Sequence, residues 1–105
     1  MVINIIIKFR EAYDEFFEYE ENRIYANDEN GNLIAEITFP PVSDDTVIID
    51  HTFVDPSLRG QGVAAKLVRA ATDQIRETGK KAEVSCVYAV RWFDEHPDDC
   101  DILVG

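Results

Sequence analysis

The first half of the chain alternates apolar and polar residues in short runs, a pattern that predicts antiparallel strands. The clearest run is Asn32–Phe39, in which every second residue is apolar and would lie on one face of a sheet. Met1–Phe9, Glu15–Tyr19 and Arg23–Asn27 are further stretches with strand-forming composition. Asp28–Gly31 favours a turn, so a hairpin is expected there. The apolar positions of the clearest run are Leu33, Ala35, Ile37 and Phe39.

The second half combines one strongly apolar strand with one long amphipathic helix. Thr46–Val54 is predicted to be a single strand, which follows the stop imposed by Pro40 and Pro41. Val63–Thr78 is predicted to be the helix, because apolar residues recur there at every fourth position, and Gly79 is a natural C-cap. The recurring apolar positions are Val63, Leu67, Ala71 and Ile75.

The end of the chain completes the predicted fold. We expect a last strand over Ala82–Tyr88, a short amphipathic turn over Val90–Glu95 and an apolar tail, Cys100–Gly105, that packs back. A meander followed by strand, helix and strand is typical of an α/β or α+β fold with a mixed sheet. The 105 residues, 46% of them hydrophobic, suit a single domain over residues 1–105, in which residues 1–16 form an N-terminal extension or an extra strand.

The net charge of −11 makes nucleic acid and anionic membranes poor partners. Within residues 56–82, however, basic side chains outnumber acidic ones by six to two. This basic island either holds an anionic ligand or is the solvent face of the predicted helix. The acidic remainder either attracts a cationic substrate or keeps the protein soluble.

Cysteine content and apolar run length bear on the cellular setting. Cys86 and Cys100 do not have the spacing of a zinc site, and Cys100 is predicted to be structural because acidic residues flank it. The apolar run Ile5–Ile7 is too short for a membrane span or a signal segment. We therefore expect a reducing, cytoplasmic environment and no metal.

The loop between the apolar strand and the helix carries the most specific chemical signal. The first helical turn leaves backbone N–H groups unpaired at the positive end of the helix dipole, just after Gly60 and Gly62. Because glycine has no Cβ, such a loop lets the backbone approach a phosphate or pyrophosphate. The Walker pattern does not fit, since Val63 and Ala64 replace its Lys-Ser/Thr pair, and Ala65 stands where the dinucleotide fingerprint has a third glycine.

The remaining pattern, Arg59-x-x-Gly62-x-Ala64, resembles the acyl-coenzyme A pyrophosphate loop of the GNAT N-acetyltransferase superfamily. Its flanks extend the likeness to the small stand-alone members of that superfamily. Residues 51–54 form a His-Thr-x-Val strand, and residues 86–88 form a Cys-x-Tyr element like theirs.

This resemblance, over about residues 17–102, implies a GNAT-like mixed sheet and acetyl-CoA or coenzyme A (CoA) as the cofactor. Loop amides would bind the pyrophosphate. The pantetheine arm would lie where the parallel strands Thr46–Val54 and Ala82–Tyr88 splay apart. The implied cofactor-binding residues are Val54, Arg59, Gly60, Gln61, Gly62, Val63 and Ala64.

The resemblance also suggests three catalytic residues, each with a structural alternative. Cys86 is either a nucleophile that carries the acetyl group or a small buried apolar residue. His51 either orients Cys86 or acts as a general base, or it is a hydrogen-bonded core residue. Tyr88 either protonates the departing coenzyme A thiolate or packs in the core with Trp92 and Phe93.

Three functions are compatible with these patterns. The first is acetyl-CoA-dependent N-acetyl transfer to an unidentified amine, directly or through an acetyl-cysteine. The second is an acyl-CoA-binding module without substantial turnover, because so short a chain lacks the extra helices that build an acceptor pocket. The third is a structural or interaction protein in which the loop is only a turn. For the first, a small-molecule or peptide amine, preferably cationic, is the expected acceptor, and the protein would be a monomer or homodimer.

Overall fold

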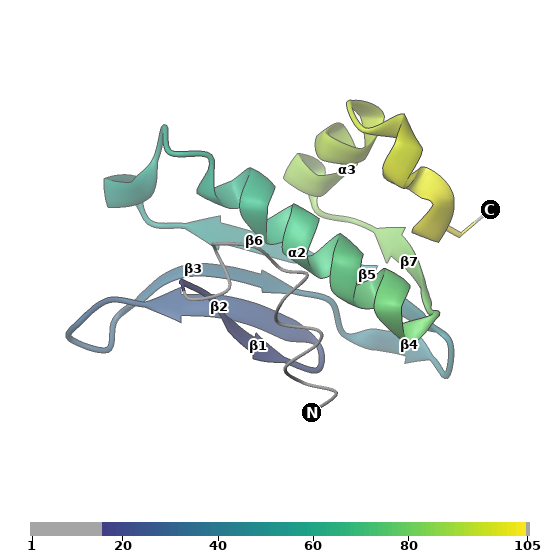
Figure 1. Ribbon diagram of the computed structural model, residues 1–105, viewed down its shortest axis with the longest axis horizontal. Helices are drawn as coiled ribbons and strands as arrows, with labels where there is room; N and C mark the ends of the chain where they lie inside the picture. The colour runs from purple at the N-terminus through teal and green to yellow at the C-terminus, as the bar shows by residue number, and fades with distance from the viewer. Residues whose placement is uncertain (1–15, 105) are drawn as a thin grey trace.

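The computed structural model describes residues 16–104, so the strand expected at Met1–Phe9 lies outside the described residues. The described strands and α-helices, in chain order, are β1 (Glu18–Glu20), β2 (Arg23–Asn27), β3 (Leu33–Thr38), β4 (Pro41–Ser43), β5 (Thr46–Ile49), β6 (His51–Val54), α2 (Val63–Thr78), β7 (Lys81–Val84) and α3 (Val87–Asp94). Two 3-10 turns are also described: η2 (Pro56–Leu58) lies between β6 and α2, and η3 (Pro97–Ile102) follows α3. The strands form two sheets, with α2 running along one side of both (Figure 1). The mixed α/β fold class is confirmed.

The larger sheet is an antiparallel meander, as predicted, with strand order β1-β2-β3-β6. Its central hairpin turns at Asp28, whose carboxylate accepts hydrogen bonds from the backbone N–H groups of Asn30 and Asn32, both at 2.9 Å. The alternating face of β3 supplies Ala35 and Ile37 to the core, while Leu33 at the strand end stays partly exposed. One face of this sheet therefore packs against the hydrophobic core.

The long helix α2 has the predicted bounds and packs against the core face of the larger sheet. Its predicted apolar positions are all buried, and it contacts β2, β3 and β6. Gly79 ends the helix with a φ of 75°, and its N–H donates to the carbonyls of Ile75 and Arg76. Within residues 16–104 no helix is long and apolar enough to cross a membrane.

The prediction of a single strand over Thr46–Val54 is wrong, because the stretch divides at Asp50 into two strands of different sheets. β6 pairs with β3, whereas β5 pairs in parallel with β7. Asp50 is disfavoured in a strand interior, and its carboxylate accepts a hydrogen bond from the Thr38 hydroxyl at 2.5 Å. The smaller sheet therefore has the order β4-β5-β7 and diverges from the larger one after Asp50.

The strand that the two prolines were predicted to stop does end just before them, at Thr38, but pairing resumes at once in a new strand. Pro41 is the first residue of β4, an edge strand of the smaller sheet. Proline is tolerated there because an edge position does not need its missing N–H. The Pro40 carbonyl also accepts a hydrogen bond from the Ile48 N–H at 2.9 Å. The prolines mark a change of sheet.

The last strand is shorter than the predicted Ala82–Tyr88, since β7 ends at Val84 and α3 starts at Val87. Apolar residues with helical spacing determine this boundary: Ala89, Trp92 and Phe93 are the buried face of α3. The predicted turn at Val90–Glu95 is therefore the second half of a helix. The tail packs back as expected, with Ile102 buried.

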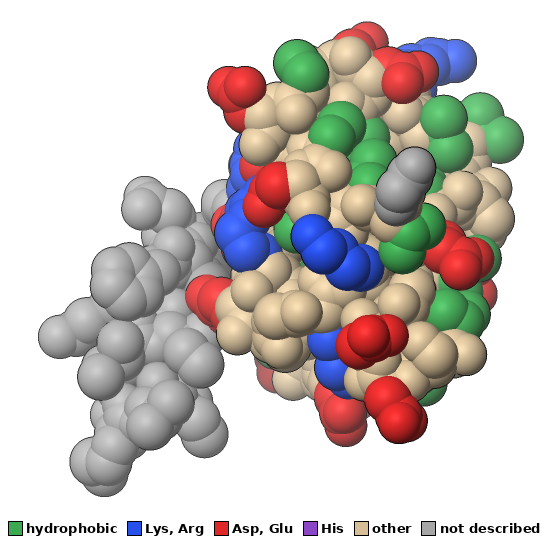
Figure 2. Space-filling model, turned by 90° about the vertical axis from the view of Figure 1, so that its right-hand side faces the viewer, with side chains coloured by type: hydrophobic (Ala, Val, Ile, Leu, Met, Phe, Trp, Pro, Cys, Tyr) green, Lys and Arg blue, Asp and Glu red, His purple; other side chains and the backbone are tan. Residues whose placement is uncertain are grey.

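Two of the six basic side chains of the island, Arg69 and Arg76, form ion pairs with the acidic turn η3. The Arg69 guanidinium donates two hydrogen bonds, at 2.8 and 2.7 Å, to the carboxylate of Asp99, while Arg76 pairs with both Asp99 and Asp101. On the face shown in Figure 2, basic and acidic side chains accordingly lie next to each other. The basic side chains of this part of α2 hold the C-terminal turn in place.

Substituting Asp99 with asparagine should destabilise the protein at neutral pH and have little effect in acid. Hydrogen bonds from Arg69 lower the pKa of Asp99 below its ordinary 3.8. The contribution of the ionised Asp99 to the free energy of unfolding is therefore complete above pH 3.8. It is lost as the pH falls through the lower folded-state pKa. We expect urea unfolding to show a loss of about 1–2 kcal/mol at pH 7 from this bidentate pair, a loss that shrinks as the pH falls below the ordinary pKa of 3.8. Asp98→Asn, at an exposed neighbour, is the control, and an equal loss from both variants would contradict the assignment.

Candidate functional site

A pocket opens where the two sheets separate. The parallel pair β5 and β7 ends with the N–H groups of Ser85 and Cys86 both donating to the Ile49 carbonyl, at 3.0 and 3.2 Å. Beyond that point β6 stays in the larger sheet, while the chain turns into α3 (Figure 1). The pocket has a volume of about 360 Å³. The strand, the loop, α2 and α3 all contribute to its lining, which consists of Thr52, Val54, Leu58, Arg59, Gly60, Gly62, Val63, Ala64, Ala65 and Tyr88.

The loop that enters this pocket is held by a local cap. The Asp55 carboxylate accepts hydrogen bonds from the N–H and hydroxyl of Ser57, at 3.0 and 2.6 Å. These hydrogen bonds, the hydroxyl first, lower the pKa of Asp55, so the cap is ionised at neutral pH. Gly60 and Gly62 then take φ values of 83° and 75°, which residues with a Cβ rarely adopt. A Cβ at either glycine would meet nothing within 4 Å, so the backbone here is open to a ligand.

The backbone N–H groups of residues 60–65 form the main chemical feature of the pocket. Within the described part of the chain none of them donates a hydrogen bond, and the first intrahelical bond runs from Lys66 N–H to the Gly62 carbonyl at 3.1 Å. The positive end of the α2 dipole lies at the same place. The loop therefore presents a row of donors suited to an anion with several oxygen atoms.

Tyr88 lies on the first turn of α3 and lines the same pocket as the glycine loop. It is 38% exposed, so the alternative of a core aromatic packed with Trp92 and Phe93 is wrong. Partial burial, and secondarily the charge of Glu95, raise the pKa of its hydroxyl. The hydroxyl is therefore protonated at neutral pH and available as a proton donor.

Cys86 lies just after the parallel strand pair and is not part of the pocket lining, but it contacts Thr52, which is. It is the N-cap residue of α3, and its thiol donates a hydrogen bond to the Thr52 hydroxyl at 3.4 Å. The side chain is half-buried against the core. The predicted alternation with Val84 and Tyr88 had placed Cys86 on a strand, but β7 ends before it.

His51 is not brought to the pocket. Neighbouring side chains of a strand point to opposite faces, and Thr52 and Val54 occupy the pocket side of β6. The His51 ring lies on the outer face instead, with Nε2 3.3 Å from a carboxylate oxygen of Glu36. Its side chain is 51% exposed, so the predicted pairing with Cys86 and the core alternative are both wrong.

Three residues of the pocket lining were not among the predicted site residues, although Thr52 belongs to the His-Thr-x-Val element. Thr52 is the partner of Cys86, and its place two residues before Val54 on the same strand was the available signal. Leu58 and Ala65 form apolar wall on either side of the glycines. Gln61, a predicted loop residue, does not line the pocket, and its side-chain amide lies 3.5 Å from the Ser57 carbonyl.

Comparisons with known proteins identify the family and support the fold. A family model described as GCN5-related N-acetyl-transferase matches residues 23–102. Protein NATD1 of Xenopus tropicalis is 35% identical over 63 residues, covering 60% of this chain but only 58% of that protein, and Protein NATD1 of Danio rerio is 28% identical over 96 residues, covering 91% and 84%. The solution structure of a GCN5-like protein from Staphylococcus aureus matches with a TM-score of 0.70 at 35% identity, over 85% of this chain and 87% of that one. The chain belongs to the GCN5-related N-acetyltransferase family.

Proposed function

We propose that this protein transfers the acetyl group of acetyl-CoA to an amine, in the pocket between the glycine loop and α3. Proteins of this fold family generally use acetyl-CoA. The observation that carries the proposal is the row of unpaired N–H groups at residues 60–65, on the wall of a pocket large enough for a thioester arm.

The residues of the pocket fit this cofactor. A pyrophosphate presents several anionic oxygens, and the loop offers main-chain donors together with the exposed Arg59 guanidinium. Gly60 and Gly62 leave the approach to these donors free of side chains. The apolar wall that leads inwards from the loop, which includes Val54 and Ala65, suits the pantetheine arm.

Acetyl-CoA supplies an acetyl group already activated as a thioester. The protein must therefore position an amine, allow it to lose a proton, and provide a proton for the leaving sulfur. The amine nitrogen forms a bond to the acetyl carbon as the carbon–sulfur bond breaks. The Tyr88 hydroxyl, which is protonated at neutral pH, then donates a proton to the departing sulfur. No carboxylate or imidazole lines the pocket among the described residues, so the amine loses its proton to water.

Cys86 is the candidate for an indirect route, in which its sulfur takes the acetyl group before the amine does. Its support is its place at the N-cap of α3 and its contact with Thr52 on the pocket wall. Mass mapping after incubation with acetyl-CoA tests this route. An increase of one acetyl group on Cys86 that an added amine removes would establish it, whereas retained turnover in Cys86→Ala without any adduct would exclude it.

The proposed function is tested by calorimetric titration followed by a transfer assay. We expect coenzyme A and acetyl-CoA to bind at one site, and release of free thiol when a panel of polyamines and lysine-containing peptides is added. Binding with no transfer to any panel amine would instead support an acyl-CoA-binding module. The proposal fails if coenzyme A does not bind at millimolar concentration.

A further inference from the structure

The glycine loop is anchored on its strand side by one acidic residue. The Asp55 N–H donates to the carbonyl of Ile34 on β3 at 2.8 Å, so the Asp55 backbone is tied to the larger sheet. The Asp55 side chain reaches forward along the chain, and one of its carboxylate oxygens, Oδ2, accepts both hydrogen bonds from Ser57. Asp55 therefore connects the first residues of the loop to the sheet on which the pocket is built.

The 3-10 turn η2 carries this connection into the loop. The Leu58 N–H donates to the Asp55 carbonyl at 2.9 Å, and Leu58 both packs against the core and lines the pocket. Val63, the first residue of α2, is buried as well. The residues between them, 59–62, are all exposed. The cap at Asp55 thus fixes the point at which the exposed segment leaves the core.

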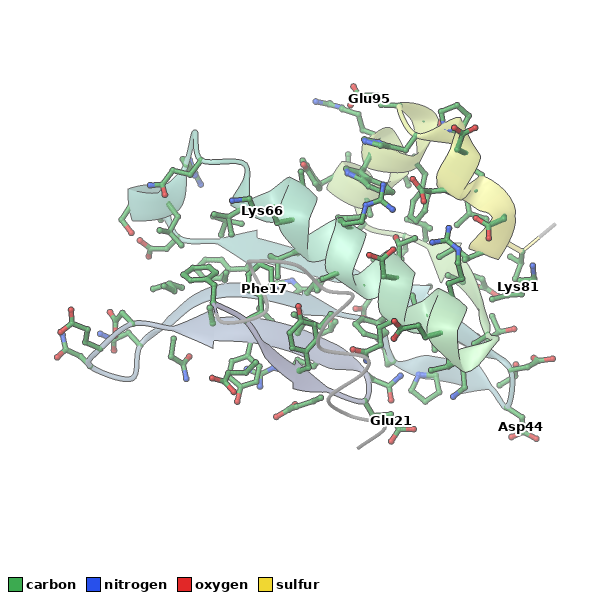
Figure 3. All side chains as sticks on the ribbon, viewed as in Figure 1. Phe17, Glu21, Asp44, Lys66, Lys81 and Glu95 are labelled. Carbon is green, nitrogen blue, oxygen red and sulfur yellow. The ribbon has the colours of Figure 1, made fainter. Side chains whose placement is uncertain are left out.

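The exposed segment needs an anchor because it contains two glycines. Glycine loses more conformational freedom on ordering than any other residue, so a loop without an anchor would become ordered only as a ligand binds. The cost of that ordering would be subtracted from the affinity for the ligand. Figure 3 shows the loop at the end of α2 that carries Lys66, with Lys81 beyond the other end. The cap and the helix therefore hold the segment from its two sides.

We propose that Asp55 is a positioning residue for coenzyme A, whose cap holds the main-chain donors of residues 60–65 in the arrangement that binds the pyrophosphate. The inference rests on the proposed function, because those donors are the proposed pyrophosphate site. Val54 and Leu58, on either side of the cap, line the pocket, whereas Asp55 and Ser57 do not. Asp55 therefore acts through the loop. Its negative charge by itself would repel a pyrophosphate, so its contribution comes from accepting hydrogen bonds.

Substitutions at the cap separate hydrogen bonding from charge. Asp55→Ala removes the acceptor and should weaken coenzyme A binding about tenfold in calorimetric titrations, the effect of losing one capping side chain. Asp55→Asn keeps an acceptor oxygen without the charge and should stay within about twofold of the wild-type affinity. Ser57→Ala loses only the hydroxyl contact and should weaken binding about threefold. In the transfer assay Asp55→Ala should raise KM for acetyl-CoA about tenfold at unchanged kcat, since the pyrophosphate is remote from the thioester.

Asp28→Ala is the matched control, because the Asp28 carboxylate caps a turn of the same kind in the β2–β3 hairpin. Both alanine variants should lower the melting temperature, but Asp28→Ala should keep the wild-type affinity and KM. Wild-type affinity in Asp55→Ala and Ser57→Ala, or an equal loss in Asp55→Ala and Asp55→Asn, would overturn the positioning role alone. A wild-type protein that does not bind coenzyme A at millimolar concentration would overturn the proposed function and this role together.

Discussion

Replacing Gly62 with glutamate will remove coenzyme A binding while leaving the protein folded. Gly62 is the N-cap residue of α2 with a φ of 75°, and the N–H groups around it are unpaired. A glutamate there places a carboxylate at the positive end of the helix dipole, where it competes with and repels a pyrophosphate. We expect calorimetric titration to show at least about a hundredfold loss of affinity, or about 2.7 kcal/mol.

The matched control for this substitution is Gly79→Glu at the other end of the same helix. Gly79 also has a φ of 75° and open space around a built Cβ, so both variants carry the same left-handed backbone cost of about 1–2 kcal/mol. Both should therefore unfold at a lower temperature, but only Gly62→Glu should lose coenzyme A. Equal binding by the two variants would mean that the loop is only a turn.

The parts of the fold that were predictable are those with a long and regular pattern. Val63–Thr78 repeats its apolar positions over four turns, and the structure begins and ends the helix at the same residues. The glycine loop was found for a related reason, since a strand, two glycines and a helix form a local unit whose geometry depends little on distant residues.

The errors arose where contacts between distant residues decide the structure. Arg69 and Asp99 are 30 positions apart, so no local pattern shows that part of the charge of the basic island is paired with distant carboxylates. The division of Thr46–Val54 at Asp50 depends on long-range pairing, since β5 pairs with β7 and β6 pairs with β3. The short run from Ala82 to Tyr88 fits both a strand and the start of a helix, and the burial of Trp92 selects the helix. The position of Tyr88 on the pocket wall follows from that selection.

Replacing Tyr88 with phenylalanine should slow acetyl transfer by about a hundredfold without weakening coenzyme A binding. Loss of a positioned proton donor costs about 10²–10⁴-fold in rate, and phenylalanine preserves the ring that lines the pocket. The measurement is thiol release from acetyl-CoA with the panel amine that the wild-type protein acetylates fastest, alongside a calorimetric titration. A fall in rate that is matched by an equal fall in affinity would instead identify Tyr88 as a binding residue.

The pH dependence and a second tyrosine make this test specific. Because burial raises the pKa of Tyr88 above its ordinary value of 10.0, its proton is present throughout the neutral range and is lost only as the pH rises through the higher value. Ionisation of this hydroxyl should therefore cause no fall in the wild-type rate up to about pH 9. Tyr25→Phe is the matched control: Tyr25 lies on β2, with its ring beneath the Arg23 guanidinium rather than in the pocket. An equal loss of rate in the two variants would show that the effect of Tyr88→Phe is not proton donation, and the protonation of the leaving sulfur would then have to come from solvent.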